Sequence, residues 1–425
     1  MSRNLLVISH AFNMDGRAAS QTITDKIPFF ISKGFKIQVI SSVSGLRSKK
    51  LNHRQILPWS ASGIKFDSRY LFRRNLGTKF LYKLSLALFS LILLPLIFIE
   101  KFFIRLPSHA AWSLPAAISG IFRVKYRKVN VVYTTGGAWS AHLAGYWIWK
   151  TTNVPWIVEL HDPLIEISKV NSSDLESRLK IWLERKICLN ANLVWWFCEG
   201  AEKTARDRNP PLGGIGFNEF AGANPPIIKE NYVKSTKLVF SHFGSLSEGR
   251  SLKPFLKDLK RNIDMKNITT QEVVLNIYGG NLDSLSKKTI DELGLSSIVR
   301  EYGRIERDNF ESGRSKIMRS MLKSDVMLVM HGQDRNCSEY IPSKFYECLY
   351  ARRAVLVYEY LNPQFRKLLL DFGCYHRNSN NSGANTLQKI IFDWKDKNLK
   401  FTEKVISTEN LVNRIIYELE IKKIL

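Results

Sequence analysis

Two apolar runs of strand length, joined by a helical segment, constrain the fold of this chain most. The runs are Asp325–Met330 and Ala354–Tyr358. Between them, Pro342 and Ser343 predict a helix start, because Pro suits the first turn and Ser can cap free N–H groups. Strand, loop, helix and strand in this order form a βαβ unit, which requires a parallel sheet. In such sheets, ligands bind at the carboxyl ends of strands and at helix N-termini.

Charged residues stand at this expected binding edge. Glu339 lies in the loop ahead of the helix, and Lys344 lies in its first turn. A diphosphate there would meet Lys344 as well as the free N–H groups and the positive end of the helix dipole. Glu347 lies one turn further along and could accept hydrogen bonds from a ribose diol. One helix start therefore offers partners to a sugar, a diphosphate and a ribose.

The same stretch resembles the donor site of family-4 glycosyltransferases of the GT-B fold. The family's signature is a pair of glutamates separated by seven residues, as Glu339 and Glu347 are. Pro-Ser-Lys-Phe-Tyr-Glu is also similar to a variant found in bacterial surface-polysaccharide enzymes. The chain departs from the family where Arg352, Arg353 and Ala354 replace a small Gly-Pro type turn. The resemblance implies two Rossmann-like domains facing a central cleft. The alternative is an ordinary surface helix with solvated glutamates.

The length and the turn-rich stretches indicate two domains. A chain of 425 residues is long enough for two separate cores. Gly, Pro and Asn are concentrated in Asn209–Gly216 and Ala221–Pro226, where we place the boundary. We expect an acceptor-side domain over 1–225 and a nucleotide-sugar domain over 226–405. The resemblance implies that a last helix, in 406–425, packs back on the first domain.

The resemblance extends to a second phosphate contact in the C-terminal half. A strand ends at Gly244, and Arg250 follows at the next helix start. Gly244 would admit the diphosphate, and Arg250 would pair with it through its bidentate fork. Ser343 and Lys344 complete the predicted donor site with the two glutamates. Arg250 and Lys344 would stabilise the departing nucleotide diphosphate. A solvated Arg250 is the alternative.

Two loops of the N-terminal half are predicted to line the cleft. The first follows the strand Leu5–Ile8, and the resemblance gives Gly16 a close backbone approach and Arg17 a phosphate or acceptor contact. Arg17 at a solvated helix start is equally compatible with the pattern. The second loop begins with His161 and Asp162, and in the family it lies near the transferred sugar. His161 could instead be a structural histidine at a strand end. The resemblance makes His161 and Glu339 catalytic together with the two diphosphate contacts.

Positive charge is concentrated in one fifth of the chain. Residues 46–130 hold sixteen Lys and Arg against two acids, so they supply +14 of the net +25. This excess implies an acidic partner, such as anionic lipid, nucleic acid or a phosphorylated substrate.

Within this basic region, Leu84–Ile99 is an uncharged apolar run interrupted by Pro95. It is shorter than the roughly 20 residues of a membrane span. Basic residues flank it, which predicts a segment over 70–107 that docks on an anionic membrane surface. A buried core helix and a true span are the alternatives. The predicted membrane contacts are Leu84, Leu91, Leu94, Ile97, Arg73, Arg74, Lys79 and Lys83.

These patterns together favour a retaining, metal-independent glycosyltransferase with a nucleotide-sugar donor and a lipid-linked acceptor. Retention is implied by the resemblance alone. We expect no cofactor and no metal, and the five cysteines lack CxxC spacing, which favours a reducing compartment. No signal peptide precedes the first strand, so we expect a cytoplasmic protein on the inner face of the membrane. The alternatives are a GT-B-type sugar epimerase and a basic protein that binds nucleic acid.

Overall fold

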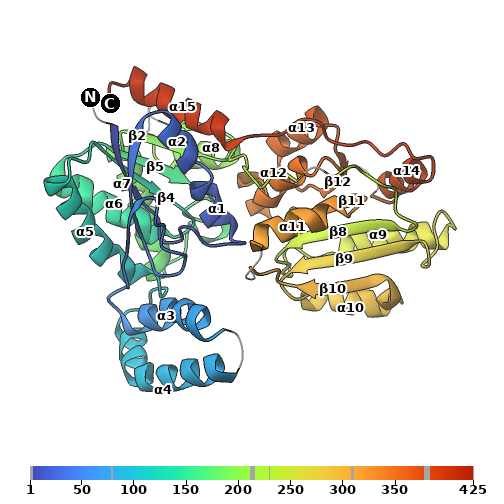
Figure 1. The fold of residues 1–425 in the computed structure, drawn as a ribbon, viewed down its shortest axis with the longest axis horizontal. Coiled ribbons are helices and arrows are strands. Elements are labelled where there is room, and N and C mark those ends of the chain that lie inside the picture. Colours follow the sequence, from blue (N-terminus) through green and yellow to red (C-terminus); the bar gives the residue numbers. More distant parts are fainter. Residues whose placement is uncertain are drawn as a thin grey trace. The chain divides into compact units, whose positions relative to one another are not determined.

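The computed structural model describes residues 3–77, 80–210, 216–228, 230–307, 311–377 and 383–424. The chain divides into two compact units (Figure 1). The first contains Met1–Phe220 and Thr408–Leu425, and the second contains Ala221–Ser407. Each unit is built on one sheet in which all paired strands run parallel. The predicted α/β class with two Rossmann-like domains is confirmed.

The first unit has a seven-stranded sheet in the order β3-β2-β1-β4-β5-β6-β7. The central strands are short apolar runs that are buried on both faces, as parallel strands between helices must be. The strands are β1 (Arg3–Ile8), β2 (Phe35–Ser41), β3 (Asn52–Gln55), β4 (Val131–Thr135), β5 (Trp156–Leu160), β6 (Leu193–Trp196) and β7 (Gly216–Asn218).

Four helices share one core with this sheet. They are α5 (Ser113–Tyr126), α6 (Trp139–Thr152), α7 (Leu175–Asn190) and α8 (Glu199–Arg208). Small residues let α5 and α6 approach closely, since a Cβ on Gly120 would lie 2.3 Å from Ile148 Cδ1. The N-terminal helical pattern is divided into α1 (Ala18–Thr24) and α2 (Ile27–Ser32). The last helix, α15 (Thr408–Ile421), belongs to this unit and contacts α2.

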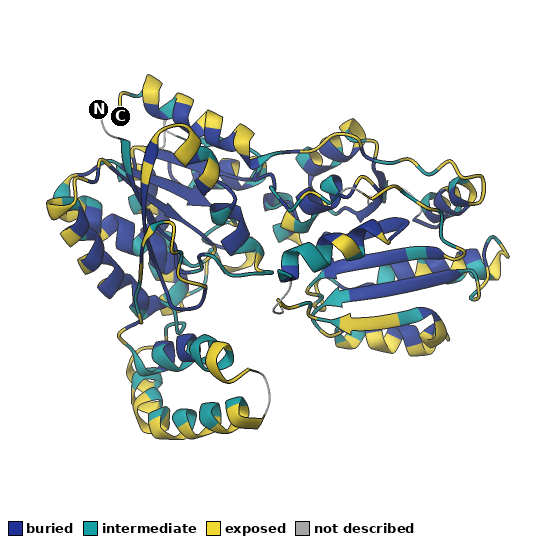
Figure 2. Cartoon of the chain, viewed as in Figure 1, coloured by how far each residue is buried: buried dark blue, intermediate teal, exposed yellow. Residues whose placement is uncertain are grey.

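A helical hairpin projects from the first unit (Figure 1). It consists of α3 (Ala61–Leu76) and α4 (Phe80–Phe103). The helix α4 has 24 residues, is longer than the predicted run, and continues through Pro95. None of its residues is buried, so the buried-core alternative is wrong (Figure 2). By length and composition alone, α4 could cross a membrane.

The helix α3 lies between α4 and the body of the first unit. Near its start, Gly63 approaches Ser108 so closely that an added Cβ would lie 2.6 Å from the Ser108 carbonyl oxygen. In its middle, Asp67 Oδ2 lies 3.6 Å from His10 Nε2. Near its end, Arg74 donates to the Gly45 carbonyl oxygen at 2.6 Å. The helix α4 packs along α3, so α3 connects α4 to the body of the unit.

The second unit has a six-stranded sheet in the order β10-β9-β8-β11-β12-β13. Its strands are β8 (Leu238–Gly244), β9 (Val273–Gly279), β10 (Val299–Gly303), β11 (Val326–Met330), β12 (Ala354–Tyr358) and β13 (Tyr375–Arg377). Three helices share a core with one face: α9 (Lys253–Asp264), α10 (Ser284–Glu292) and α14 (Gly383–Lys395). The remaining helices are α11 (Gly313–Leu322), α12 (Ser343–Tyr350) and α13 (Pro363–Asp371).

The predicted βαβ unit forms β11, α12 and β12, and the two strands pair in register. One detail differs from the prediction. Ser343 is the first residue of α12, and Pro342 takes the N-cap position without a side-chain cap. Ser343 is therefore one position too late in the chain to cap the helix. The free N–H groups at this helix start stay available to a ligand.

Candidate functional site

The loop after β11 carries Glu339 to the carboxyl edge of the second sheet. The loop starts with buried His331, whose Nε2 donates to the Tyr340 carbonyl oxygen at 2.9 Å. Burial lowers the pKa of His331 to about 4, so its imidazole is neutral. Gly332 has a φ of +151°, and a Cβ there would lie 2.5 Å from Cys337 Sγ. Glu339 is almost completely buried. These contacts fix the conformation of the loop.

Arg250 reaches this loop from the segment before α9. Its Nη2 donates to the Tyr340 hydroxyl at 3.2 Å, and its guanidinium lies 5.5 Å from the centre of the Tyr340 ring. Tyr340 directly follows Glu339 in the chain, so the structure brings these two predicted residues, Arg250 and Glu339, to the same loop. Gly244 ends β8 with a φ of +142°, which favours glycine, and an added Cβ would lie 3.9 Å from His242 Nε2.

Glu347 is held by two cations. Arg314 Nε at the start of α11 donates to Oε1 at 3.0 Å, and the Lys344 ammonium donates to Oε2. Burial raises the pKa of Glu347, but Lys344 and Arg314 outweigh it and hold the pKa below its ordinary value. Both carboxylate oxygens therefore have partners already. Lys344, the predicted diphosphate contact, forms an ion pair with Glu347 one turn along its own helix.

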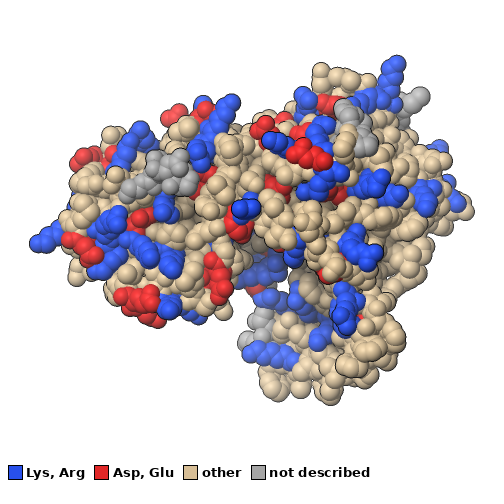
Figure 3. Space-filling view, turned by 180° about the vertical axis from the view of Figure 1, so that it is seen from behind, with Lys and Arg blue, Asp and Glu red and all other residues tan. Residues whose placement is uncertain are grey.

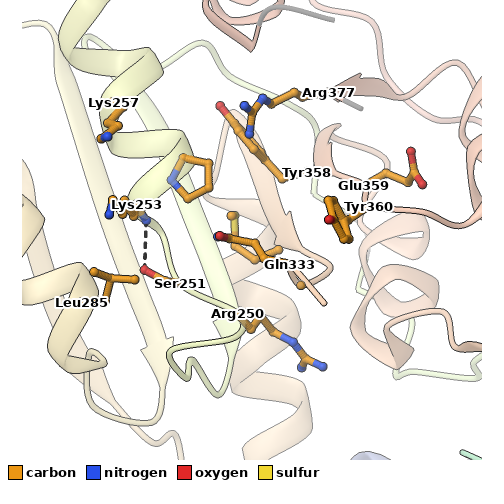
Figure 4. Close-up of a pocket in the computed structure, with 13 residues that line it drawn as sticks. Arg250, Ser251, Lys253, Lys257, Leu285, Gln333, Tyr358, Glu359, Tyr360 and Arg377 are labelled. Atoms are coloured by element: carbon orange, nitrogen blue, oxygen red, sulfur yellow. Dashed lines mark hydrogen bonds between the residues drawn. The ribbon is translucent and has the colours of Figure 1, made fainter. Parts of the chain in front are cut away.

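A cavity of about 430 Å³ opens beside Arg250 (Figure 4). It lies between the start of α9 and the ends of β11, β12 and β13. Lys253, Lys257 and Arg377 contribute positive charge to its lining. The N–H of Lys253, the first residue of α9, already donates to Ser251 Oγ at 3.1 Å, so this helix start adds the positive end of its dipole to the field. An anionic group is the ligand that this edge favours.

His161 follows β5 at the carboxyl edge of the first sheet. Its Nε2 lies 2.9 Å from Glu159 Oε1 and 3.0 Å from Thr135 Oγ1. The ring also packs against Phe197, with 5.0 Å between the ring centres. The side chain is only 7% exposed. His161 is thus anchored by neighbouring strands, with one edge of the ring close to the surface.

The other predicted residues of this edge are more exposed. Gly16 has a φ of +69° in the loop after β1. Arg17 occupies the N-cap position of α1, is exposed, and makes no side-chain cap. Asp162 is exposed as well. The structure thus places them in the expected loops.

The predicted membrane residues fall into three groups. Leu84, Leu91 and Leu94 are exposed on α4, whereas Ile97 is half-buried. Arg74 is exposed, and its Nη2 donates to the carbonyl oxygens of Val43 and Gly45. Arg73 is half-buried, Lys83 is exposed, and Lys79 lies outside the described residues. On the face in Figure 3, the hairpin at the lower right shows basic residues beside a broad uncharged surface.

Sequence reasoning missed Arg314, Tyr340 and Glu159. Arg314 is 33 residues from its partner Glu347, and no spacing rule connects the two. Tyr340 lies inside the glutamate motif, and its position between Glu339 and Pro342 could have indicated that it belongs to the site. Glu159 is a charged residue in an apolar strand, which indicates a buried partner. Among the described residues, no group of three or more His, Cys, Asp or Glu side chains is placed to hold a metal ion.

Two Rossmann-like units, each with an all-parallel sheet and with the candidate site residues at its carboxyl edge, define the chain as a protein of the GT-B fold. Solved structures show the same architecture over nearly the whole chain. HepE of Anabaena in complex with UDP and glucose matches with a TM-score of 0.57 and 13% identity, covering 99% of this chain and 98% of that one. No family model and no curated protein matches the sequence.

Two further neighbours are epimerases. A putative UDP-N-acetylglucosamine 2-epimerase from Listeria monocytogenes matches with a TM-score of 0.54 and 9% identity, covering 100% of this chain and 98% of that one. UDP-GlcNAc 2-epimerase from Methanocaldococcus jannaschii matches with a TM-score of 0.51 and 10% identity, covering 98% and 100%. At these identities the likeness establishes the fold.

Proposed function

We propose that this protein is a glycosyltransferase that moves a sugar from a nucleotide-sugar donor to a membrane-associated, lipid-linked acceptor in bacterial surface-polysaccharide or lipopolysaccharide synthesis. The donor belongs to the second unit. Arg250, the uncapped start of α12 and the absence of a side chain at Gly244 suit a diphosphate. Glu339 and Glu347 lie before and within α12, at the spacing of family-4 enzymes. The HepE neighbour is in complex with UDP and glucose, which supports a ligand of this kind.

The exposed helix α4 is the observation that carries the membrane part of the proposal. Its outward face presents large apolar side chains, with exposed fractions of 66% for Leu91, 73% for Ile92 and 71% for Phe98. Such a continuous apolar surface is unfavourable in water and marks an interaction site. Lys83 and the other basic residues of the region add positive charge beside this surface. A bilayer of anionic lipids matches both the apolar surface and the positive charge.

The packing of α3 favours a helix that lies in the membrane surface over one that crosses it. A helix of 24 residues is about 36 Å long, enough to span a hydrocarbon core of about 30 Å. If α4 crossed the bilayer together with α3, however, α3 would carry Lys65, Arg69 and Arg73 into the hydrocarbon core. Each of these charges would cost about 3 kcal/mol at the bilayer centre. The helix α3 would also have to leave the Asp67 and Arg74 contacts with the body. We therefore propose a peripheral protein on the cytoplasmic face of the membrane.

During transfer, negative charge develops on the departing nucleotide diphosphate. In this proposal Arg250 would meet this charge, and Lys344 would reach it from the first turn of α12 by loosening its contact with Glu347. In this mechanism protein cations stabilise the leaving group, which suits metal-independent transfer. We propose retention of configuration on the glutamate spacing.

A thermal-shift panel of UDP-, GDP- and ADP-sugars tests the donor site. A donor at a hundred times its Kd stabilises the folded state by about 2.7 kcal/mol. One nucleotide class should raise Tm, and the Lys344→Met variant should lose that rise. Transfer is then measured with the identified donor and a lipid extract as acceptor. No stabilisation by any nucleotide sugar would refute the proposal.

An epimerase is the second candidate, and the two 2-epimerase neighbours favour it. An epimerase converts its nucleotide sugar without an acceptor and has no need for an exposed apolar hairpin. Incubation of the purified protein with the binding nucleotide sugar separates the two functions. Isomerisation without lipid supports the epimerase, whereas product formation only with lipid supports the transferase.

A further inference from the structure

Four hydrogen-bond donors surround the carboxylate of Glu159 at the end of β5. Lys26 Nζ lies 2.5 Å and Trp195 Nε1 lies 2.9 Å from Oε2. Thr135 Oγ1 lies 2.5 Å and His161 Nε2 lies 2.9 Å from Oε1. A carboxylate has about four acceptor positions, so this one is saturated. The donors come from the α1–α2 junction, β4, β6 and the loop after β5.

The side chains of Lys26 and Glu159 are both completely buried, and each is the other's ion-pair partner. Burial raises the pKa of Glu159, but the Lys26 ammonium and His161 outweigh this effect and hold the pKa below its ordinary value. Glu159 is therefore ionised at neutral pH. A buried ion pair is costly to desolvate, and an apolar pair of similar volume would serve stability as well or better. Glu159 is also the hydrogen-bond partner of His161, which suggests a role of the ion pair beyond folding.

The ionised carboxylate determines which nitrogen of His161 carries the proton. An unprotonated Nε2 would turn its lone pair toward a negatively charged oxygen at 2.9 Å. The Thr135 hydroxyl cannot relieve that repulsion while it donates to the same Glu159 oxygen. Nε2 is consequently protonated and donates. In the neutral imidazole this leaves Nδ1 with a free lone pair.

Nδ1 of His161 is available to a ligand. Within the part of the chain that the structure describes, Nδ1 has no hydrogen-bond partner, yet it is not among the polar atoms that are buried without one. It therefore reaches the surface at the carboxyl edge of the sheet. A neutral nitrogen with a lone pair accepts hydrogen bonds, and hydroxyl groups are the abundant donors of a sugar.

We propose that Glu159 and Lys26 are positioning residues that fix His161 as the Nε2–H tautomer, so that Nδ1 accepts a hydrogen bond from a hydroxyl group of the sugar substrate. This inference rests on the proposed function for the identity of the ligand. The tautomer itself is independent of that function. His161 contacts the substrate, and Glu159 and Lys26 act through it.

The first test is spectroscopic and needs no substrate. A proton–nitrogen correlation spectrum of protein labelled with ¹⁵N-histidine, recorded at pH 7.5, distinguishes the tautomers, and the signals absent from His161→Asn identify the residue. We expect a protonated Nε2 and an unprotonated Nδ1. A protonated Nδ1, in either the neutral or the charged ring, would overturn the proposal whatever the protein catalyses.

The second test removes the positioning pair without leaving a buried charge. In the double variant Lys26→Met/Glu159→Leu, His161 should populate both tautomers, and turnover should fall tenfold or more. The matched control is Glu184→Leu/Arg208→Met, which removes another ion pair of the same unit, 2.8 Å long with Glu184 buried. The control should keep both the tautomer and the turnover. Wild-type turnover in the first variant, despite mixed tautomers, would refute the positioning role.

The third test remains decisive if the double variant does not fold. His161→Asn keeps an acceptor near the position of Nδ1, His161→Gln places its amide nearer Nε2, and His161→Phe keeps only the ring shape. The His161→Asn variant should retain at least tenfold more turnover than His161→Phe, and it should also retain more turnover than His161→Gln. Equal activities in all three would overturn the proposal. Absence of turnover in the wild type with every donor would instead refute the proposed function, while the spectrum still decides the tautomer.

Discussion

At the scale of single residues, the candidate donor site is defined by pairs of charges that are far apart in the sequence. Glu347 is 5% exposed and is held between Lys344 and Arg314. Removing Glu347 takes the shared partner from both cations, whereas removing Lys344 leaves the ion pair between Arg314 and Glu347 in place. The same residues therefore affect both stability and binding, and variants must separate the two.

The variant Glu347→Ala should destabilise the second unit as well as abolish donor binding. Breaking a buried ion pair costs about 3–5 kcal/mol, which corresponds to a fall in Tm of roughly 10 °C. Lys344→Met removes the more exposed partner and should cost much less stability while removing the donor-induced thermal shift. Calorimetry with and without donor measures both effects. An unchanged Tm in Glu347→Ala would show that the Arg314 contact is absent in solution.

Gly332 provides a second residue-level prediction. An alanine Cβ there would collide with Cys337 Sγ at 2.5 Å and adopt a φ of +151°. Gly332→Ala should therefore distort the loop that carries Glu339, lower stability by about 1–3 kcal/mol and weaken donor binding at least tenfold. Gly294→Ala is the control, because its φ of +64° is also strained but its Cβ would meet no atom within 4 Å. Equal donor affinity in both variants would contradict this role of the loop.

At the scale of elements, the α3–α4 hairpin combines two different surfaces. The inner face of α4 packs on α3, as the contact between Phe72 and Phe89 shows. Glu100 of α4 accepts a hydrogen bond from the Ser62 N–H at 2.9 Å, which stabilises the start of α3. The outer face remains apolar and exposed (Figure 2). The packing of the hairpin therefore does not depend on its outer face.

Replacing outer-face residues of α4 should abolish membrane binding and leave the fold intact. Each large apolar side chain buried in lipid contributes about 1.5–3 kcal/mol, so Leu91→Ser/Ile92→Ser/Phe98→Ser should bind anionic liposomes at least 100-fold more weakly. Leu370→Ser, at an exposed apolar position of the second unit, is the control. Cosedimentation measures binding, and circular dichroism measures folding. Wild-type protein that ignores liposomes would remove the membrane from the proposal.

At the scale of the whole molecule, histidine protonation links stability to pH. Burial lowers the pKa of six of the eight histidines, to about 3 for His10 and His142 and to about 4 for the other four: His53, His109, His242 and His331. The unfolded chain, with an ordinary pKa of 6.5, takes up protons before the folded one does. Stability is therefore fully present above pH 6.5 and declines as the pH falls toward 4.

Acid unfolding should consequently begin in the first unit, which holds four of these six histidines. For the fully buried His242, the loss at pH 5 is about 2 kcal/mol. Asp67 acts in the opposite direction, because burial raises its pKa to about 7 and its neutral form favours the folded state at acidic pH. Hydrogen exchange between pH 7.5 and 5 should show the first unit losing protection first. Earlier loss in the second unit would contradict this order.

The sequence by itself determined the architecture and the placement of the motif residues. Parallel strands buried on both faces need continuous apolar runs, and Pro and Gly mark the turns between them, so both sheets could be predicted locally. The spacing of Glu339 and Glu347 likewise depends on one loop and one helix.

Only the tertiary structure decided which side chains meet. Arg314 reaches Glu347 from the start of another helix, α11, and Lys26 reaches Glu159 on β5 from the α1–α2 junction. The exposure of α4 depends on what the fold leaves uncovered, and the engagement of Arg74 depends on a loop thirty residues away. Long-range contacts of this kind arise from the mutual packing of complete elements, and no local pattern in the sequence encodes them.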